Sequence, residues 1–285
     1  MKMKSFFAGL CAVAFCVAAQ AQDVTKPVLT VEEFSGNASK DALNALRNGV
    51  IAGVQHSGRV EVVDIHNEAA LKAEQSRRER EEAMGDAGRV EEMGSLMSNA
   101  ILRGTLDKLV VTRNERTDSQ GKRRITFTAN IAYTLSIINA KNGTLAASQV
   151  FEQTGYGNTE QEAFNEVLTP AEKPLTRFIN NAYKAEGKVL AIAEDDGKKA
   201  KAVYINLGSN DGVKKGQKVE IFKEINIDGE ISNKLIGEAK IEEVMSSKRS
   251  LCKVGKGADV VLKEFGNGTK MPVKTKEEKA GFFDF

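Results

Sequence analysis

The clearest pattern in the chain is a strict alternation of apolar and polar residues across positions 125–137. Its apolar members are Ile125, Phe127, Ala129, Ile131, Tyr133, Leu135 and Ile137. Such alternation predicts a β-strand with one buried face and one polar face. Asn142-Gly143 is a strong hairpin turn signal, so residues 145–156 are expected to return as the next strand. Leu102, Leu106 and Val110 recur every four residues and predict an earlier strand.

Helical spacing appears in two other parts of the chain. Ser39 is a candidate N-cap for a helix whose apolar residues recur at intervals of three and four, namely Leu43, Leu46, Val50 and Val54. The sequence at 159–162 is a capping box that predicts a second helical stretch, interrupted by Pro170 and Pro174. Residues 28–34 and 59–64 are expected strands, and the charged segment 67–82 is an expected exposed helix.

The second half of the chain has a different pattern. From residue 187 onward, short segments that include an expected strand at 259–263 are separated by glycine-bearing turns such as Asp228-Gly229, and no helical period appears. This pattern predicts a small all-β barrel of the SH3-like kind. The fold class is therefore α+β. We expect an α/β sandwich at 22–185 with helices packed on a mixed sheet, the barrel at 186–265, and a polar, disordered tail at 266–285.

The N-terminus has the order of a secretory signal peptide. Lys2 and Lys4 precede an apolar run at 6–19 and the small-x-small site that ends at Ala21, so we expect cleavage between Ala21 and Gln22. The apolar run is about 14 residues long, short of the roughly 20 that a spanning helix needs. A bacterial lipidation site needs small residues before its cysteine, whereas Leu10 precedes Cys11 and Phe15 precedes Cys16, so a lipid anchor is disfavoured. The expected product is periplasmic and has no spanning helix.

The charge balance and the cysteine count limit which classes of partner and chemistry are expected. Cleavage would remove two of the 41 basic residues and leave 39 basic against 39 acidic residues. A neutral chain gives no reason to expect nucleic acid or an acidic membrane surface as a partner. Cys252 would be the one remaining cysteine, so an internal disulfide is excluded. We expect it to be a buried small apolar residue and not a reactive thiol.

No motif in the chain predicts catalysis. His56 and His66 lack a second His or Cys at metal-ligand spacing, and no nucleophile elbow is present. The glycine-rich segment 208–216 leads into a strand and lacks the ending of a phosphate-binding loop. Asp195-Asp196 precedes a glycine and is interpreted as a turn. We therefore expect no catalytic residue, no cofactor and no metal, and we predict that the protein is not an enzyme.

Several of these segments together resemble the CsgG/LpoB superfamily, which includes curli secretion channels and activators of penicillin-binding proteins. The resemblance rests on the early strand–helix–strand order, on a helix carrying Glu74-Gln75, and on the segments 93–104, 133–143 and 155–157. Residues 205–219 resemble the C-terminal barrel of the flagellar assembly protein FlgT. The first resemblance covers most of 27–184, and the second covers the barrel.

The resemblance implies one of two functions. The first is a non-catalytic accessory protein, periplasmic or associated with the outer membrane, that binds an envelope machine for cell-wall synthesis or surface assembly. The alternative is an oligomeric outer-membrane channel component of the curli type. A membrane strand needs about 9–11 residues, whereas the loop at 114–123 is short and charged. This favours the accessory protein, whose envelope partner the sequence does not identify; homo-oligomers without a pore remain open. Phe282, Phe283 and Phe285 are candidate partner contacts.

Overall fold

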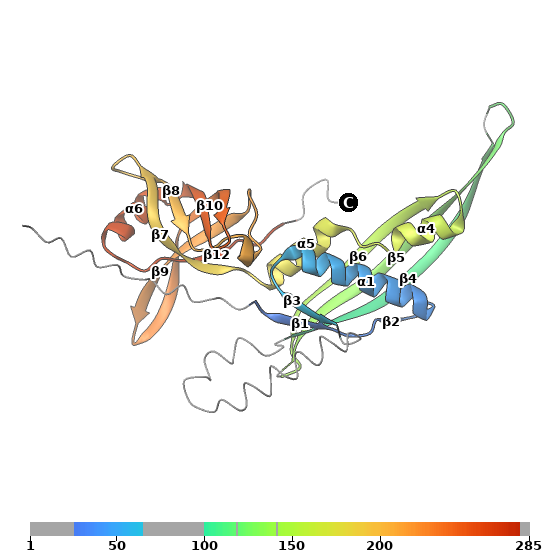
Figure 1. Ribbon diagram of the computed structural model, residues 1–285, viewed down its shortest axis with the longest axis horizontal. Helices are drawn as coiled ribbons and strands as arrows, with labels where there is room; N and C mark the ends of the chain where they lie inside the picture. The colour runs from blue at the N-terminus through green and yellow to red at the C-terminus, as the bar shows by residue number, and fades with distance from the viewer. Residues whose placement is uncertain (1–25, 65–99, 118, 141, 280–285) are drawn as a thin grey trace, which may run out of the picture.

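The structure is a computed structural model that describes residues 26–64, 100–117, 119–140 and 142–279. Within these ranges the chain forms an open mixed sheet with helices and a closed barrel (Figure 1). This confirms the α+β class and the small barrel that follows it. The expected helix at 67–82, the cleavage site at Ala21 and Gln22, and Phe282, Phe283 and Phe285 lie outside the described residues.

The sheet has the strand order β3-β1-β4-β5-β6. Strand β1 (Val28–Val31) pairs in parallel with both β3 (Glu61–Asp64) and β4 (Ala100–Thr117). Strands β4, β5 (Arg123–Asn139) and β6 (Leu145–Gly157) form an antiparallel meander, and the short β2 (Ser35–Gly36) pairs with β4. The expected strands at 28–34, 59–64 and 125–137 are therefore present, although β1 and β3 are shorter than predicted.

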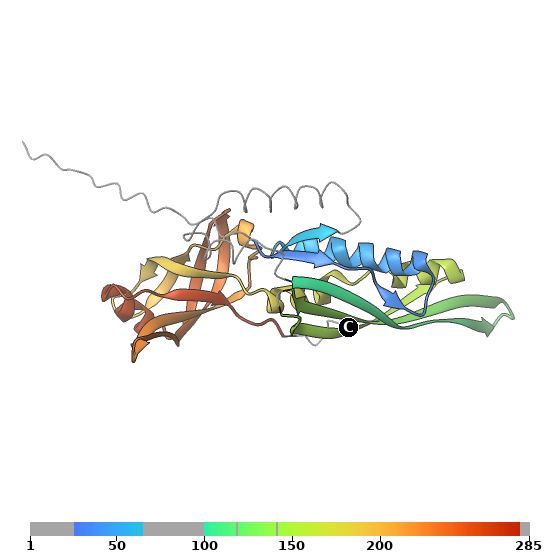
Figure 2. The same ribbon diagram turned by 90° about the horizontal axis from the view of Figure 1, so that it is seen from below.

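Three helices lie on one face of this sheet (Figure 2): α1 (Lys40–Ser57), α4 (Glu160–Val167) and α5 (Glu172–Ala182). The predicted N-caps are confirmed. Ser39 Oγ accepts a hydrogen bond from the Ala42 amide at 3.2 Å, and Thr159 Oγ1 accepts one from the Glu162 amide at 3.2 Å. Pro174 lies in the first turn of α5, where a missing backbone N–H costs no helical hydrogen bond.

The core of this unit lies between the helices and the inward side chains of the sheet. The alternating apolar residues of β5 are buried from Ala129 to Ile137, as the pattern predicts. Tyr133 stacks on Phe151 with ring centroids 5.2 Å apart, and Phe151 meets Phe178 of α5 edge-on at 5.7 Å. These aromatic contacts fix α5 against β5 and β6, so the helix layer is confined to one side of the sheet.

The barrel closes in the order β10-β11-β8-β7-β12-β9. Its strands are β7 (Glu186–Asp195), β8 (Ala200–Ile205), β9 (Lys218–Ile227), β10 (Glu230–Ser246), β11 (Arg249–Lys256) and β12 (Pro272–Thr275). A 3-10 turn, η1 (Ser209–Asp211), follows β8, and a helix, α6 (Ala258–Gly266), follows β11. The predicted turns at Asp196-Gly197 and Asp228-Gly229 join β7 to β8 and β9 to β10.

Two predictions for the C-terminal part are wrong. Residues 259–263, expected as a strand, belong to α6, whose nine residues are too few for a helical period to stand out. The segment 266–285, expected as a disordered tail, contains β12, which pairs with both β7 and β9 and so closes the barrel. Met271 and Val273 are buried there. Their two-residue spacing places both inside the barrel, but the Lys- and Glu-rich surroundings hide that signal.

Candidate functional site

One whole face of the sheet carries no helix of the described chain. This open face consists of the outward side chains of β4, β5 and β6, which the strand register arranges in cross-strand rows. In order along β4 from its N-terminal end, the rows are Arg103–Ser136–Ser148, Thr105–Thr134–Val150, Lys108–Ala132–Glu152, Val110–Asn130–Thr154 and Thr112–Thr128–Tyr156. The outward residues of β5, the central strand of the meander, are half-buried and not covered. The open face is therefore broad, continuous and accessible.

Small hydroxyl and amide side chains dominate the open face and bond to one another across the strands. Thr134 Oγ1 donates to Asp107 Oδ2 at 2.6 Å, and Thr154 Oγ1 donates to Asn130 Oδ1 at 2.9 Å. The Ser136 and Ser148 hydroxyls lie 3.0 Å apart. These hydrogen bonds hold the polar side chains of the open face in place.

Exposed apolar side chains are set among these hydroxyls. Val150 is 58% exposed and Tyr156 is 66% exposed, both on β6, and Val110 of β4 is 45% exposed. Apolar and aromatic groups surrounded by satisfied polar groups are typical of the centre of a protein interface. The open face thus has the chemistry of a contact surface.

Strands β4 and β5 continue past the end of β6 as a two-stranded arm. The last pair that β6 makes is Gly157 with Phe127, whereas β4 and β5 remain paired out to Thr117 and Arg123. We call residues 114–117 and 119–126 the arm; it projects from the sheet in Figures 1 and 2. Only four cross-strand pairs lie beyond β6.

The sheet and the barrel meet at a buried arginine. Arg59, just before β3, is 4% exposed, and all three guanidinium nitrogens bond to protein oxygens. Nε donates to Asn180 Oδ1 of α5 at 3.3 Å, Nη1 to the Asp211 carbonyl at 2.9 Å and Nη2 to Gln217 Oε1 at 3.3 Å. Burial lowers the pKa of Arg59 to about 10, which leaves it charged at neutral pH.

The last described residues complete this junction. Glu278 Oε1 accepts hydrogen bonds from Asn180 Nδ2 at 3.0 Å and from Gln217 Nε2 at 2.8 Å. Asn180 belongs to the sheet unit and Gln217 to the barrel, so the carboxylate joins the two units beside Arg59. The backbones are also in close contact here, because a Cβ on Gly212 would lie 2.7 Å from the Ser57 carbonyl oxygen. Buried hydrogen bonds and close backbone contact therefore join the two units at this junction.

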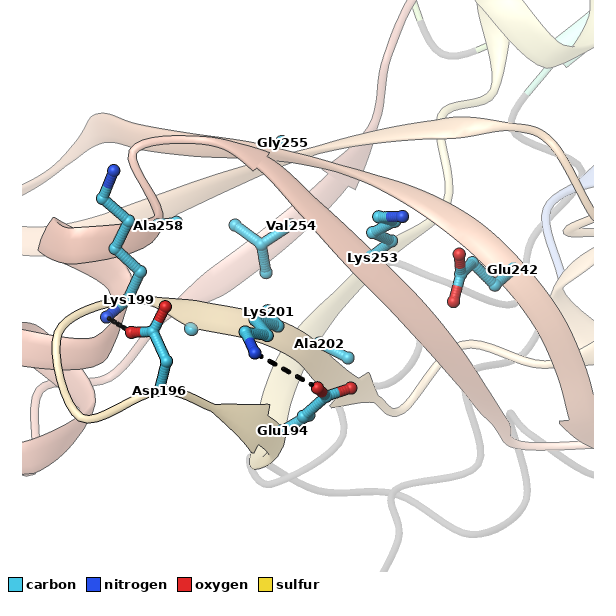
Figure 3. Close-up of a pocket in the computed structure, with 11 residues that line it drawn as sticks. Glu194, Asp196, Lys199, Lys201, Ala202, Glu242, Lys253, Val254, Gly255 and Ala258 are labelled. Atoms are coloured by element: carbon cyan, nitrogen blue, oxygen red, sulfur yellow. Dashed lines mark hydrogen bonds and ion pairs between the residues drawn. The ribbon is translucent and has the colours of Figure 1, made fainter.

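The barrel also has a cavity of about 370 Å³, lined by the β7–β8 hairpin, β10, β11 and the start of α6 (Figure 3). Two of its charged side chains form an ion pair, since Lys201 Nζ lies 3.6 Å from Glu194 Oε1. Asp196 Oδ1 accepts the backbone amides of Lys198 and Lys199, at 3.0 and 2.8 Å, and these bonds lower the pKa of the Asp196 carboxyl. The residues that line this cavity include no Ser, Thr, Cys or His.

The residues that the sequence singled out are not brought together. Asp195 and Asp196 both accept turn amides, which confirms their interpretation as a turn. Cys252 is fully buried, as expected, and burial raises the pKa of its thiol to about 12. His56 is exposed in the last turn of α1. Among the described residues, no three His, Cys, Asp or Glu side chains gather as a metal site would require.

Sequence reasoning missed both the open face and the junction. The polar half of the alternation in β5 was visible, but the sequence could not show that helices cover only the other half. Arg59 was assigned to an ordinary strand. Its two side-chain partners, Asn180 and Gln217, lie 121 and 158 positions further along the chain, so no local signal could have identified it.

Comparison with known proteins gives no family for this chain. No family model matches it, and no curated protein matches it. Three similar solved structures are a PelC dodecamer from Paraburkholderia phytofirmans, a putative neuraminyllactose-binding hemagglutinin homologue from Helicobacter pylori and a minor lipoprotein from Acinetobacter baumannii. Their identities are 14%, 9% and 9%, and their TM-scores are 0.32, 0.34 and 0.30.

These likenesses involve about half of the chain. They cover 54%, 55% and 55% of this protein and 89%, 82% and 94% of the respective structures. At such identities and TM-scores they determine neither the family nor the function of this chain. In the described part of the chain, no helix combines the length and the apolar character needed to cross a bilayer.

Proposed function

We propose that this protein is a non-catalytic accessory protein of the bacterial envelope that binds a protein partner through the open face of its sheet. The observation that carries the proposal is the open face itself. Val110, Val150 and Tyr156 are exposed there among hydroxyl groups that already have hydrogen-bond partners. The CsgG/LpoB resemblance and the signal peptide expected from the sequence support an envelope location.

The shape of the open face favours a protein over a small molecule. Small-molecule sites are concave and bury most of their ligand. The open face spans five cross-strand rows of three residues on a β-sheet, an extent that suits an interface of about 800 Å² on each partner. The binding energy would then concentrate on a few large side chains, for which the exposed Val150 and Tyr156 are the candidates.

The curli-type channel is the weaker candidate. The arm extends beyond β6 by only four cross-strand pairs, whereas a membrane strand needs about 9–11 residues. Membrane strands also present an apolar band to lipid. Arg116 and Arg124 occupy the outward position of the arm, so it lacks such a band. These features support an accessory protein that works by contact.

The proposal can be tested by site-specific photocrosslinking in the native host. A photoreactive residue at Val150 or at Thr134 would sample the open face, and one at Gln161, exposed on α4, is the matched control on the helix side. We expect Val150 and Thr134 to yield the same discrete protein adduct, and Gln161 to yield none. Equal adducts from Gln161, or no adduct from either open-face position, would contradict the proposal.

A substitution then separates contact from folding. Val150→Asp places a charge at an exposed position, so the fold should tolerate it with a stability change within about 0.5 kcal/mol. At the centre of a protein interface the same charge would be desolvated, and binding of the crosslinked partner should fall at least tenfold. Unchanged affinity for that partner in a pull-down would remove Val150 from the interface.

A further inference from the structure

The tip of the arm carries a concentration of positive charge that the neutral composition of the chain conceals. Between positions 113 and 124 the cations are Arg113, Arg116, Lys122, Arg123 and Arg124. Glu115 is the one acidic residue in the described part of this segment, and it pairs with Arg113 at 3.3 Å and with Arg123. Arg113, Glu115 and Arg123 all point to the helix side of the sheet, the side of the apolar alternation in β5.

The open-face side of the arm has no such compensation. Arg116 and Arg124 stand directly opposite each other in the β4–β5 register, and both are exposed. Neither makes an ion pair or a side-chain hydrogen bond among the described residues. Two like charges opposite each other in an antiparallel pair destabilise the hairpin. An anion that bridged the two guanidinium groups would turn this repulsion into attraction.

From this geometry we infer that the arm docks end-on against an anionic lipid surface, with the phosphate groups of the lipids bridging Arg116 and Arg124. Three observations favour a surface over a soluble anion or a protein. The arm is a projecting two-stranded ribbon (Figure 1). Its cations lie on both sides and in the turn, which suits a continuous plane of charge better than a one-sided partner.

The third observation concerns the apolar content of the tip. Ile125 directly follows Arg123 and Arg124 in the sequence and is 39% exposed. An apolar side chain among cations matches the boundary of a bilayer, where head-group phosphates and acyl chains meet. Each Lys or Arg near an anionic membrane contributes a roughly fivefold increase in binding at moderate salt, and the contribution decays within a Debye length. The inference concerns the arm and not the open face, so it does not depend on the proposed protein partner.

The test is flotation of the purified protein with lipid vesicles. Neutral vesicles of phosphatidylcholine are compared with vesicles containing about one third phosphatidylglycerol. We expect binding to the anionic vesicles only, with a decrease between 50 and 300 mM salt, since screening shortens the reach of the charges. Arg116→Gln with Arg124→Gln should reduce this binding about thirtyfold.

Lys214→Gln with Lys215→Gln is the matched control, because it removes two exposed cations from the barrel and changes net charge by the same amount. It should float like the wild type. The arm variant should melt at or above the wild-type temperature, because it relieves the Arg116–Arg124 repulsion. Equal binding by the two variants would overturn the inference, and so would equal binding to neutral and anionic vesicles. Retention on dextran sulfate without binding to vesicles would assign the arm to a soluble polyanion and also overturn it.

Discussion

Replacement of Arg59 by Met should uncouple the sheet from the barrel. Met preserves an apolar stem of similar length but removes the guanidinium group and its three hydrogen bonds, which reach Asn180, Asp211 and Gln217. Two of those partners belong to the barrel side of the junction. Glu278 would also lose its favourable electrostatic interaction with Arg59. The variant should therefore leave each core intact and weaken the connection between them.

The size of the effect follows from the burial and from the number of bonds. Hydrogen bonds from a charged donor are worth about 1.5–3 kcal/mol each, and the cost of burying the charge offsets a large part of this. A net contribution of roughly 1 kcal/mol per bond gives a loss of about 3 kcal/mol for the three. For a chain of this size that corresponds to a fall in Tm of about 6–12 °C.

Calorimetry combined with hydrogen exchange can distinguish uncoupling from general loss of stability. Arg47→Met is the matched control, because Arg47 is equally buried but bonds to the carbonyls of Glu32 and Val31 within the sheet unit. Arg59→Met should raise exchange on both sides of the junction, in 205–217 and in 272–279 as well as near α5. Arg47→Met should raise exchange in the sheet unit alone. Unchanged protection of 205–217 in the Arg59 variant would refute the reasoning.

Two further substitutions test other parts of the packing. Gly212→Ala should lower the free energy of unfolding by more than about 2 kcal/mol in a urea titration, because Gly212 has a φ of 64° and an added Cβ would collide with the Ser57 carbonyl. Gly197→Ala is the control, because Gly197 has a φ of 79° but open space around it, and it should cost only about 1 kcal/mol. Tyr183→Phe should raise the free energy of unfolding by about 1 kcal/mol, because the Tyr183 hydroxyl is buried without a hydrogen-bond partner in the described structure; a loss of stability in urea would show that the hydroxyl is satisfied.

The elements that the sequence predicted correctly are those whose signals are local. The alternation in β5, the caps at Ser39 and Thr159, and the turn at Asp228-Gly229 each depend on residues within a few positions of one another. Asp228 has a φ of 54°, the conformation that an Asp-Gly turn requires. Such signals determine which segments become strands and helices, and they also indicate which side of each element is buried.

The elements that it did not predict depend on distant parts of the chain. Strand β12 has only four residues and lies in a Lys-rich segment, and it is ordered because β7 and β9 leave a gap that Val273 fills. Composition over a 20-residue window cannot detect a strand whose stability comes from both neighbours. The same reasoning applies to Arg59, whose partners come from α5, from η1 and from the loop before β9.

Net charge was the least informative of the sequence observations, because it sums charges that lie on separate surfaces of the protein. The equal numbers of acidic and basic residues expected after cleavage gave no reason to consider an anionic surface. The strand register changes this conclusion, since it places Arg116 opposite Arg124 at the end of a ribbon, at least four rows beyond the acidic side chain of Glu152. At physiological salt a charge is felt over about 8 Å, so carboxylates as far away as Glu152 do not neutralise the tip, and Glu115 within the arm is paired with Arg113 and Arg123. The relevant quantity for binding is therefore the charge within one Debye length of the contact, and only the fold determines it.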